Sequence, residues 1–189
     1  MAGPASGRDA EAMRWSDLER GAPRLATRAR ERLVDPGVLL VATIRRDGSP
    51  RLSPVEPLLF DGDLWLSMMW RSRKAVDIVR DNRVLLHSIV QGPQDPSGEI
   101  KVRGRAVAVD DGDERRRYCD AVEHLGWRPV EPYFHLFVID ITDASSVRYE
   151  RNGDQYVARW PAGIEFVRRE TSPTSVGEPQ PIVDLLGTR

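Results

Sequence analysis

Residues 38–83 of the chain read VLLVATIRRDGSPRLSPVEPLLFDGDLWLSMMWRSRKAVDIVRDNR. The run opens with apolar and β-branched residues of strand length, and Asp47-Gly48 then gives a strong signal for a tight hairpin turn. A second turn is expected at Asp61-Gly62-Asp63. The prolines between these turns donate no ladder hydrogen bond, which favours an edge or bulged strand there. Together these signals predict a meander of three strands, over residues 38–44, 49–60 and 64–69.

A helix is expected to begin directly after the third strand. Ser72 is its predicted N-cap, and the apolar residues that follow have helical spacing. The N-terminus of a helix offers unpaired backbone N–H groups and the positive end of the helix dipole. Ser72 adds a hydroxyl group, while Arg73 and Lys74 add positive charge. The cluster Trp70-Arg71-Ser72-Arg73-Lys74 therefore predicts a phosphate-binding cradle, and the alternative is a capped surface helix with solvated basic side chains.

The rest of the chain also favours an antiparallel sheet with few helices. Gly104 interrupts a long strand pattern and indicates a bulge or a close backbone approach. The order of elements has too few crossover helices for a parallel sheet, so we expect a mainly β protein with flanking helices (α+β), closed as a small barrel of six to seven strands. Further strands are expected over residues 84–90, 99–109, 134–141, 147–151 and 155–160, with helices over 11–33 (two, broken at Gly21 and Pro23) and 113–125.

Three segments are expected along the chain. Residues 1–33 form an N-terminal tail and helical segment, residues 34–162 the barrel domain, and residues 163–189 a C-terminal tail. The 28 basic and 29 acidic side chains give a net charge of −1, which does not favour nucleic acid as a partner. No apolar run approaches the roughly 18 residues of a membrane-spanning helix, and no secretory signal is visible. The single cysteine, Cys119, excludes an intrachain disulfide, so we expect a reduced, cytoplasmic protein.

The ordered set of signals between residues 38 and about 109 resembles the pyridoxamine 5′-phosphate oxidase-like family, the flavin-binding split β-barrels. The resemblance lies in the Asp-Gly hairpin, in Ser53-Pro54-Val55 on the second strand, in Ser72-Arg73-Lys74, and in the strand that contains Gly104. It covers about half of the chain. The resemblance implies an antiparallel split β-barrel that forms a homodimer, with FMN bound at the subunit interface and a small molecule as substrate.

The resemblance also implies roles for individual residues. Ser72, Arg73 and Lys74 match the positions that bind the FMN phosphate, and Ser67 and Met68 match the strand end that borders the flavin. The second strand lines the ring, and Trp70 either stacks on a flat ring or packs on the core or the partner. The candidate cofactor-binding residues are Arg51, Leu52, Ser53, Pro54, Ser67, Met68, Trp70, Ser72, Arg73 and Lys74. No catalytic side chain and no metal ligand is assigned.

The function implied is an FMN-dependent oxidoreductase that transfers hydride to or from a small molecule. The chain ends in Asp184-Leu-Leu-Gly-Thr-Arg189, without the signature that holds vitamin B6 in true pyridoxamine phosphate oxidases, so oxidation of that vitamin is not expected. An F420-dependent reductase is the alternative, because both cofactors present a ring and a phosphate. A non-catalytic flavin- or haem-binding protein is the third interpretation, with haem the least favoured cofactor and His135 its candidate ligand.

Overall fold

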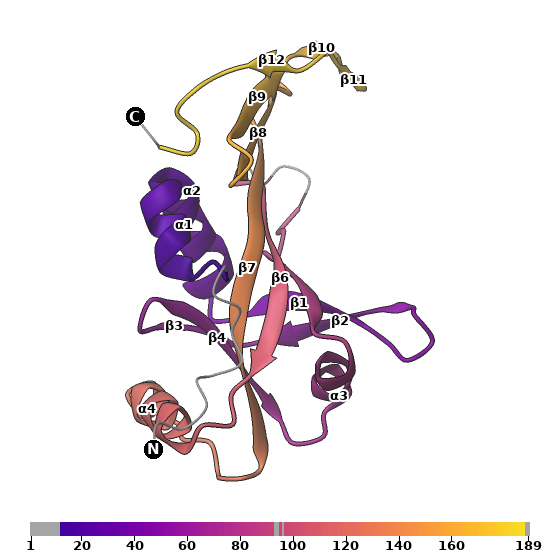
Figure 1. Cartoon of the computed structure of the whole chain (residues 1–189). Helices are drawn as coiled ribbons and strands as arrows, with labels where there is room; N and C mark the ends of the chain where they lie inside the picture. The colour runs from indigo at the N-terminus through magenta and orange to yellow at the C-terminus, as the bar shows by residue number, and fades with distance from the viewer. Residues whose placement is uncertain (1–11, 93–94, 96, 188–189) are drawn as a thin grey trace.

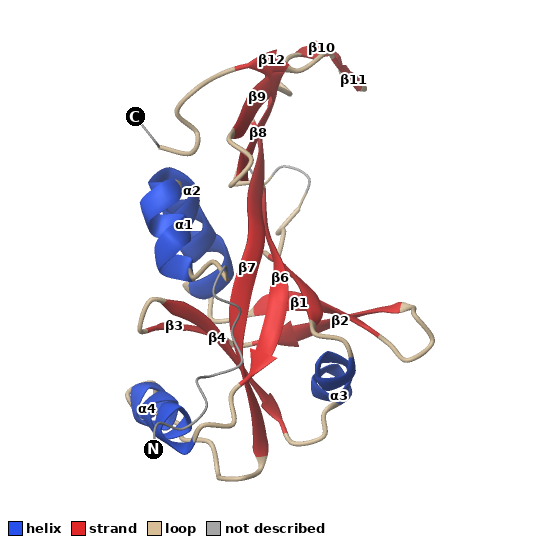
Figure 2. Ribbon diagram, viewed as in Figure 1, coloured by secondary structure: helices blue, strands red, loops and turns tan. Residues whose placement is uncertain are grey.

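The computed structural model describes residues 12–92, 95 and 97–187. An antiparallel sheet forms its centre, drawn in red in Figure 2, and helices lie against it. The strands of this sheet are β1 (Leu39–Ile44), β2 (Pro50–Val55), β3 (Pro57–Phe60), β4 (Asp63–Met69), β5 (Arg83–His87), β6 (Glu99–Ala108), β7 (Phe134–Tyr149), β8 (Gln155–Trp160), β9 (Ile164–Arg168) and β12 (Gln180–Pro181). A separate pair consists of β10 (Glu170–Ser172) and β11 (Ser175–Val176).

The strand order is β12-β9-β8-β7-β6-β5-β1-β2, with β4 paired to β7 and β3 to β4. The mainly antiparallel α+β architecture is thus confirmed, but the sheet has ten strands where six or seven were expected. The additional strands come from residues 163–189, where the sequence indicated only a tail, and from a break within residues 49–60. The described pairings end at β2, β3 and β12 and do not by themselves close a barrel.

Three predicted strands are wrong in their extent. The expected strand over residues 49–60 is divided at Glu56, because β2 pairs with β1 whereas β3 pairs with β4, so the predicted meander does not form. Residues 134–149 form one strand rather than two. Asp143 in its middle is buried and forms ion pairs with Arg103 of β6 and Arg159 of β8. These cross-strand pairs let a locally polar sequence remain in the sheet.

The strand β6 carries the bulge that Gly104 predicts. Its register against β7 shifts between Arg103 and Gly104. A Cβ atom at Gly104 would lie 2.2 Å from the backbone oxygen of Asp140, closer than any real contact allows. Gly104 therefore permits both the bulge and the close approach of the two strands.

The helices are α1 (Trp15–Gly21), α2 (Pro23–Ala29), the π-helical turn η1 (Arg30–Val34), α3 (Arg73–Arg80) and α4 (Gly112–Glu123). The predicted break between two N-terminal helices is confirmed, since α2 begins at Pro23. Figure 1 shows α1 and α2 on one side of β7, α3 on the other, and α4 near the lower end. The larger core includes Leu18, Leu25 and Leu33 of the N-terminal segment, and a second core lies under α4 around Trp65 and Tyr118.

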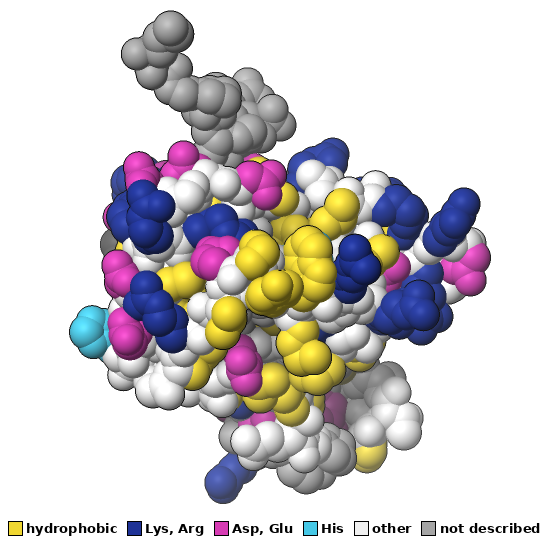
Figure 3. All heavy atoms as spheres, turned by 90° about the horizontal axis from the view of Figure 1, so that it is seen from below, with side chains coloured by type: hydrophobic (Ala, Val, Ile, Leu, Met, Phe, Trp, Pro, Cys, Tyr) yellow, Lys and Arg dark blue, Asp and Glu magenta, His cyan; other side chains and the backbone are white. Residues whose placement is uncertain are grey.

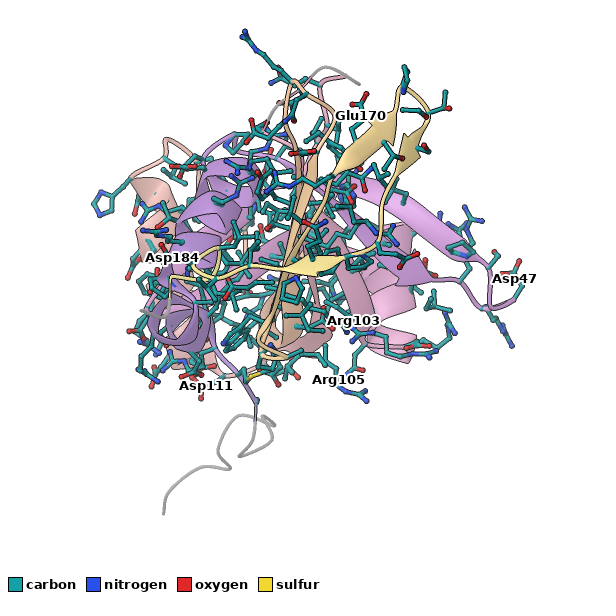
Figure 4. The ribbon with its side chains drawn as sticks, turned by 90° about the horizontal axis from the view of Figure 1, so that it is seen from above. Asp47, Arg103, Arg105, Asp111, Glu170 and Asp184 are labelled. Carbon is teal, nitrogen blue, oxygen red and sulfur yellow. The ribbon has the colours of Figure 1, made fainter. Side chains whose placement is uncertain are left out.

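Two aspartates support the local turns that the sequence indicates. Asp47 lies at the tip of the β1–β2 hairpin, where its carboxylate accepts hydrogen bonds from the backbone N–H (2.9 Å) and the hydroxyl (2.6 Å) of Ser49. Asp111 caps α4 by accepting from the N–H groups of Asp113 and Glu114, each at 2.9 Å. Both aspartates are labelled in Figure 4.

Within the described residues, no helix combines the length and apolarity that crossing a membrane requires.

Candidate functional site

A cavity of about 690 Å³ lies where β2, the end of β4 and the start of α3 meet the segment that joins α4 to β7. Three cationic side chains and one carboxylate, that of Glu56, line it. Among the candidate residues, eight of ten face this cavity, although they come from three different elements. These eight are Arg51, Ser53, Pro54, Ser67, Met68, Ser72, Arg73 and Lys74.

The start of α3 is built by a sharp turn after β4. Arg71 adopts a left-handed conformation (φ 56°), and the N–H of Ser72 donates to the Met69 carbonyl at 3.0 Å. Ser72 occupies the N-cap position, as predicted, but its side chain makes no capping hydrogen bond. Its Oγ is buried and has no hydrogen-bond partner among the described residues. A buried hydroxyl without a partner is costly, so this atom is available for a ligand in the cavity.

Positive charge is concentrated beside Ser72. Arg73 is exposed at the cavity and has no ion pair or hydrogen bond within the described part of the chain. The Lys74 ammonium donates a hydrogen bond to the Pro54 carbonyl. Burial lowers the pKa of Lys74, and the nearby Glu56 carboxylate opposes that shift. A cation that is partly desolvated and beside an unpaired guanidinium favours an anionic ligand.

Arg51 extends from β2 to the cavity, and its guanidinium is held by a residue that does not line the cavity. Its Nε donates to Oδ2 of Asp77 at 2.6 Å, and the Thr43 hydroxyl donates to the same oxygen at 3.2 Å. Asp77 lies on the buried side of α3 and is 7% exposed. The Arg51 Nη groups make no hydrogen bond to any described residue. Arg51 is therefore the third cation of the cavity.

Apolar side chains also line the cavity. The segment between α4 and β7 contributes Trp127, Val130 and Tyr133, which are 40%, 68% and 64% exposed, and Met69 adds another exposed apolar side chain. Figure 3 shows hydrophobic side chains gathered at the centre of the face seen from below, with basic side chains around them. None of these apolar residues was among the candidates that the sequence indicated. The aromatic residues and prolines of this segment are the signal in the sequence that could have indicated this apolar wall.

Two candidate residues do not line the cavity. Leu52 is 62% exposed, because side chains alternate along a strand and its neighbours Arg51 and Ser53 take the cavity side. Trp70 stacks on the His135 ring, with ring centroids 4.7 Å apart, and lines a smaller neighbouring cavity. Trp70 is 47% exposed, so both interpretations of this residue stay predictions.

His135, the candidate haem ligand, is enclosed by this stack. It lies between the rings of Trp70 and Phe137, and its Nε2 accepts a hydrogen bond from the Arg71 N–H at 3.3 Å. Burial lowers the pKa of His135, and the charge of Arg115 lowers it further. Both effects favour the neutral form of the ring, whose Nε2 is directed at the turn before α3.

Ser67 and Met68 connect the cavity to the two cores. Met68 is 3% exposed and belongs to the larger core. Ser67 lies beside the hydroxyl of Tyr118, whose burial raises its pKa to about 12. Both strand residues are therefore fixed by packing, which gives this part of the cavity a rigid floor.

Comparison with known families shows to which family the chain belongs. A model of the family described as pyridoxamine 5′-phosphate oxidase matches residues 25–148, about two thirds of the chain. The chain belongs to the pyridoxamine 5′-phosphate oxidase family. The match includes every candidate residue in the cavity, and the family commonly binds a flavin. No curated protein matches the chain.

Solved structures share the fold of this family member. A NimC/NimA family protein from Clostridium acetobutylicum aligns with a TM-score of 0.54 and 16% identity, over 76% of this chain and 96% of that one. A candidate pyridoxamine 5′-phosphate oxidase from Listeria innocua aligns with a TM-score of 0.53 and 14% identity, over 65% and 94%. An F420 reductase gives 0.46 and 21% identity, over 61% and 94%, a likeness that does not bear on the cofactor.

The residues present fit a phosphorylated flavin. The unpartnered Ser72 hydroxyl and the cations of Arg51, Arg73 and Lys74 lie on one side of the cavity, where a phosphate dianion would be matched in charge. The apolar wall of Trp127, Val130 and Tyr133 provides flat contact area for a ring. Cationic and apolar surfaces of one cavity thus match the two ends of FMN.

Replacing Ser72 by alanine separates binding from stability. Because the hydroxyl makes no capping bond, we expect Ser72→Ala to change the free energy of unfolding by less than about 0.5 kcal/mol, where loss of a working N-cap costs about 1 kcal/mol. FMN affinity is expected to fall about tenfold, since a charge-assisted hydrogen bond to phosphate is lost. Chemical denaturation and flavin fluorescence titration measure the two effects. A less stable protein with unchanged affinity would contradict this role for Ser72.

Proposed function

We propose that the protein is an FMN-dependent oxidoreductase acting on a small molecule in the cytoplasm. The buried Ser72 hydroxyl, which lacks a partner at the entrance to α3, is the observation that carries this proposal. It marks a place for an acceptor oxygen next to Arg73 and Lys74, which is the requirement of a phosphate group. Family membership supports a flavin as the group that bears this phosphate.

The residues of the chain have separate tasks in this proposal. Ser72, Arg73 and Lys74 bind the phosphate and thereby fix the position of the ring along the cavity. Trp127, Val130 and Tyr133 exclude water from one side of the ring. FMN, when bound, supplies hydride transfer to or from the substrate, and the chain orients the two reactants. Glu56 and Tyr133 also line the cavity, and neither is assigned a proton-transfer step.

We further propose that two chains associate, with the cofactor at their interface. The apolar side chains around the cavity, including the 79% exposed Met69 and the 68% exposed Val130, support an interface on this face. Exposed apolar patches of this kind mark sites of association. A light-scattering mass of twice the 21.3 kDa chain is expected, and a monomeric mass would contradict this association.

Cofactor binding and turnover test the function in sequence. The protein is titrated with FMN and, separately, with F420, and binding is followed by absorption and fluorescence. We expect FMN to bind and the reduced complex to pass hydride to an artificial acceptor such as a quinone faster than free reduced FMN does. If F420 binds and FMN does not, F420 would be the cofactor in place of FMN. Flavin binding without turnover would make the protein a carrier, and binding of neither would overturn the proposal.

A further inference from the structure

We propose that Asp77 is a positioning residue that holds Arg51 in the orientation needed to bind the phosphate end of the ligand. This inference rests on the proposed function, since it concerns the same cavity. Asp77 does not line the cavity itself. It acts on the ligand only through the guanidinium of Arg51, which does line it.

The sheet register brings the members of this network together. Thr43 of β1 and Arg51 of β2 are directly opposite each other in the antiparallel pair. Both side chains donate to one oxygen of Asp77, which comes from α3. The strand β1 and the two cavity-lining elements β2 and α3 thus meet at a single carboxylate, which is 7% exposed and does not line the cavity.

Stability alone does not account for this carboxylate. Burial of a charge requires compensation, and replacing both partners of a buried ion pair by apolar residues is often neutral or stabilising. Asp77 lies beyond the first turn of α3, where the helix dipole no longer favours an acidic side chain. The neighbouring inward-facing residues, Ala75 and Ile78, are apolar and fully buried. The charge at position 77 therefore has a use other than packing.

The mode of contact indicates that use. Asp77 engages Arg51 through Nε, so the Nη groups, which have no partner among the described residues, keep their donors for the cavity. A guanidinium anchored at Nε loses little rotational freedom when its Nη groups bind a phosphate. In contrast, Arg45 and Arg46 on the same hairpin extend from its exposed tip. Asp77 thus converts a flexible surface arginine into a preorganised phosphate ligand.

The test compares FMN with riboflavin, which differ only in the phosphate. We expect Asp77→Asn to weaken FMN binding about tenfold and riboflavin binding less than about twofold, because only the phosphate contact depends on Arg51. Arg51→Gln should give the same pattern. The double variant should be no weaker than Arg51→Gln alone, since both changes act through one group. Thr43→Val, which removes only the hydroxyl bond to Asp77, is the matched control and should keep the ratio of the two affinities.

Several outcomes separate the inference from the proposed function. Equal weakening of FMN and riboflavin by Asp77→Asn, or additive effects of the two substitutions, would overturn the positioning role. If Asp77→Asn does not fold, Arg51→Lys replaces it: an ammonium group that pairs with Asp77 offers no free planar fork to the phosphate, so wild-type discrimination between FMN and riboflavin in this variant would overturn the positioning role. Thermal stabilisation by inorganic phosphate provides a probe without the ring. Phosphate could stabilise the wild-type protein against heat, and the Asp77 and Arg51 variants could lose this effect, while no flavin binds. This result would support the inference and overturn the proposed flavin function.

Discussion

Removing both basic side chains at the start of α3 is expected to reduce FMN affinity at least about 100-fold. Charge-assisted hydrogen bonds contribute about 1.5–3 kcal/mol each, so Arg73→Ala with Lys74→Ala removes about 3 kcal/mol or more. The fold should survive, because Arg73 has no partner within the described structure and Lys74 bonds only to the Pro54 carbonyl. Flavin fluorescence titration measures the affinity, with riboflavin as the phosphate-free comparison.

A charge-matched variant controls for the general electrostatic effect. Arg45 and Arg46 lie on the exposed β1–β2 hairpin and do not line the cavity. Arg45→Ala with Arg46→Ala removes the same net charge and should change FMN affinity less than about twofold, since exposed charges are screened by salt. Equal losses in the two double variants would mean that FMN responds to overall charge and not to a site at α3.

Replacement of Gly104 by alanine is expected to cause a large loss of stability. The added Cβ would meet the backbone oxygen of Asp140 at 2.2 Å, and backbone in the sheet cannot move aside as a flexible side chain does. We expect the free energy of unfolding to fall by about 3 kcal/mol, which lowers Tm by about 6–10 °C for a chain of this size. Chemical and thermal denaturation followed by circular dichroism measure both quantities.

Gly92 provides the matched glycine for this experiment. No heavy atom of a described residue lies within 4 Å of a Cβ built at Gly92, and its backbone is not left-handed. Gly92→Ala should therefore leave the free energy of unfolding within about 0.5 kcal/mol of the wild type. If Gly104→Ala were as stable as Gly92→Ala, the close approach of β6 and β7 would not exist in solution.

Local signals in the sequence placed much of this site. The change from strand to helical period located the start of α3, and the turn residues located the strands before it. The grouping of Ser72, Arg73 and Lys74 followed because they are adjacent in the chain. Gly104 was interpretable because a glycine inside a strand usually marks a bulge or a close backbone approach. That these residues bind a cofactor stays a prediction.

Other features depend on contacts between distant segments. The segment with Trp127 and Tyr133 has no regular period, so its return to the cavity could not be inferred. The ion pair between Arg51 and Asp77 joins residues 26 positions apart, and neither residue alone indicates the other. The single long strand β7 contains a polar stretch whose partners, Arg103 and Arg159, lie on neighbouring strands. Local propensity is overridden by such tertiary contacts.

The central claim is that the cavity binds a redox-active cofactor through the phosphate group of that cofactor. Equilibrium binding of FMN and riboflavin to the wild-type protein under one set of conditions tests it most directly. We predict that FMN binds at least about 100-fold more tightly, because in the proposed complex Ser72, Arg73, Lys74 and Arg51 would contact the phosphate and not the ring. Equal affinity for the two flavins, or binding of neither, would contradict the account.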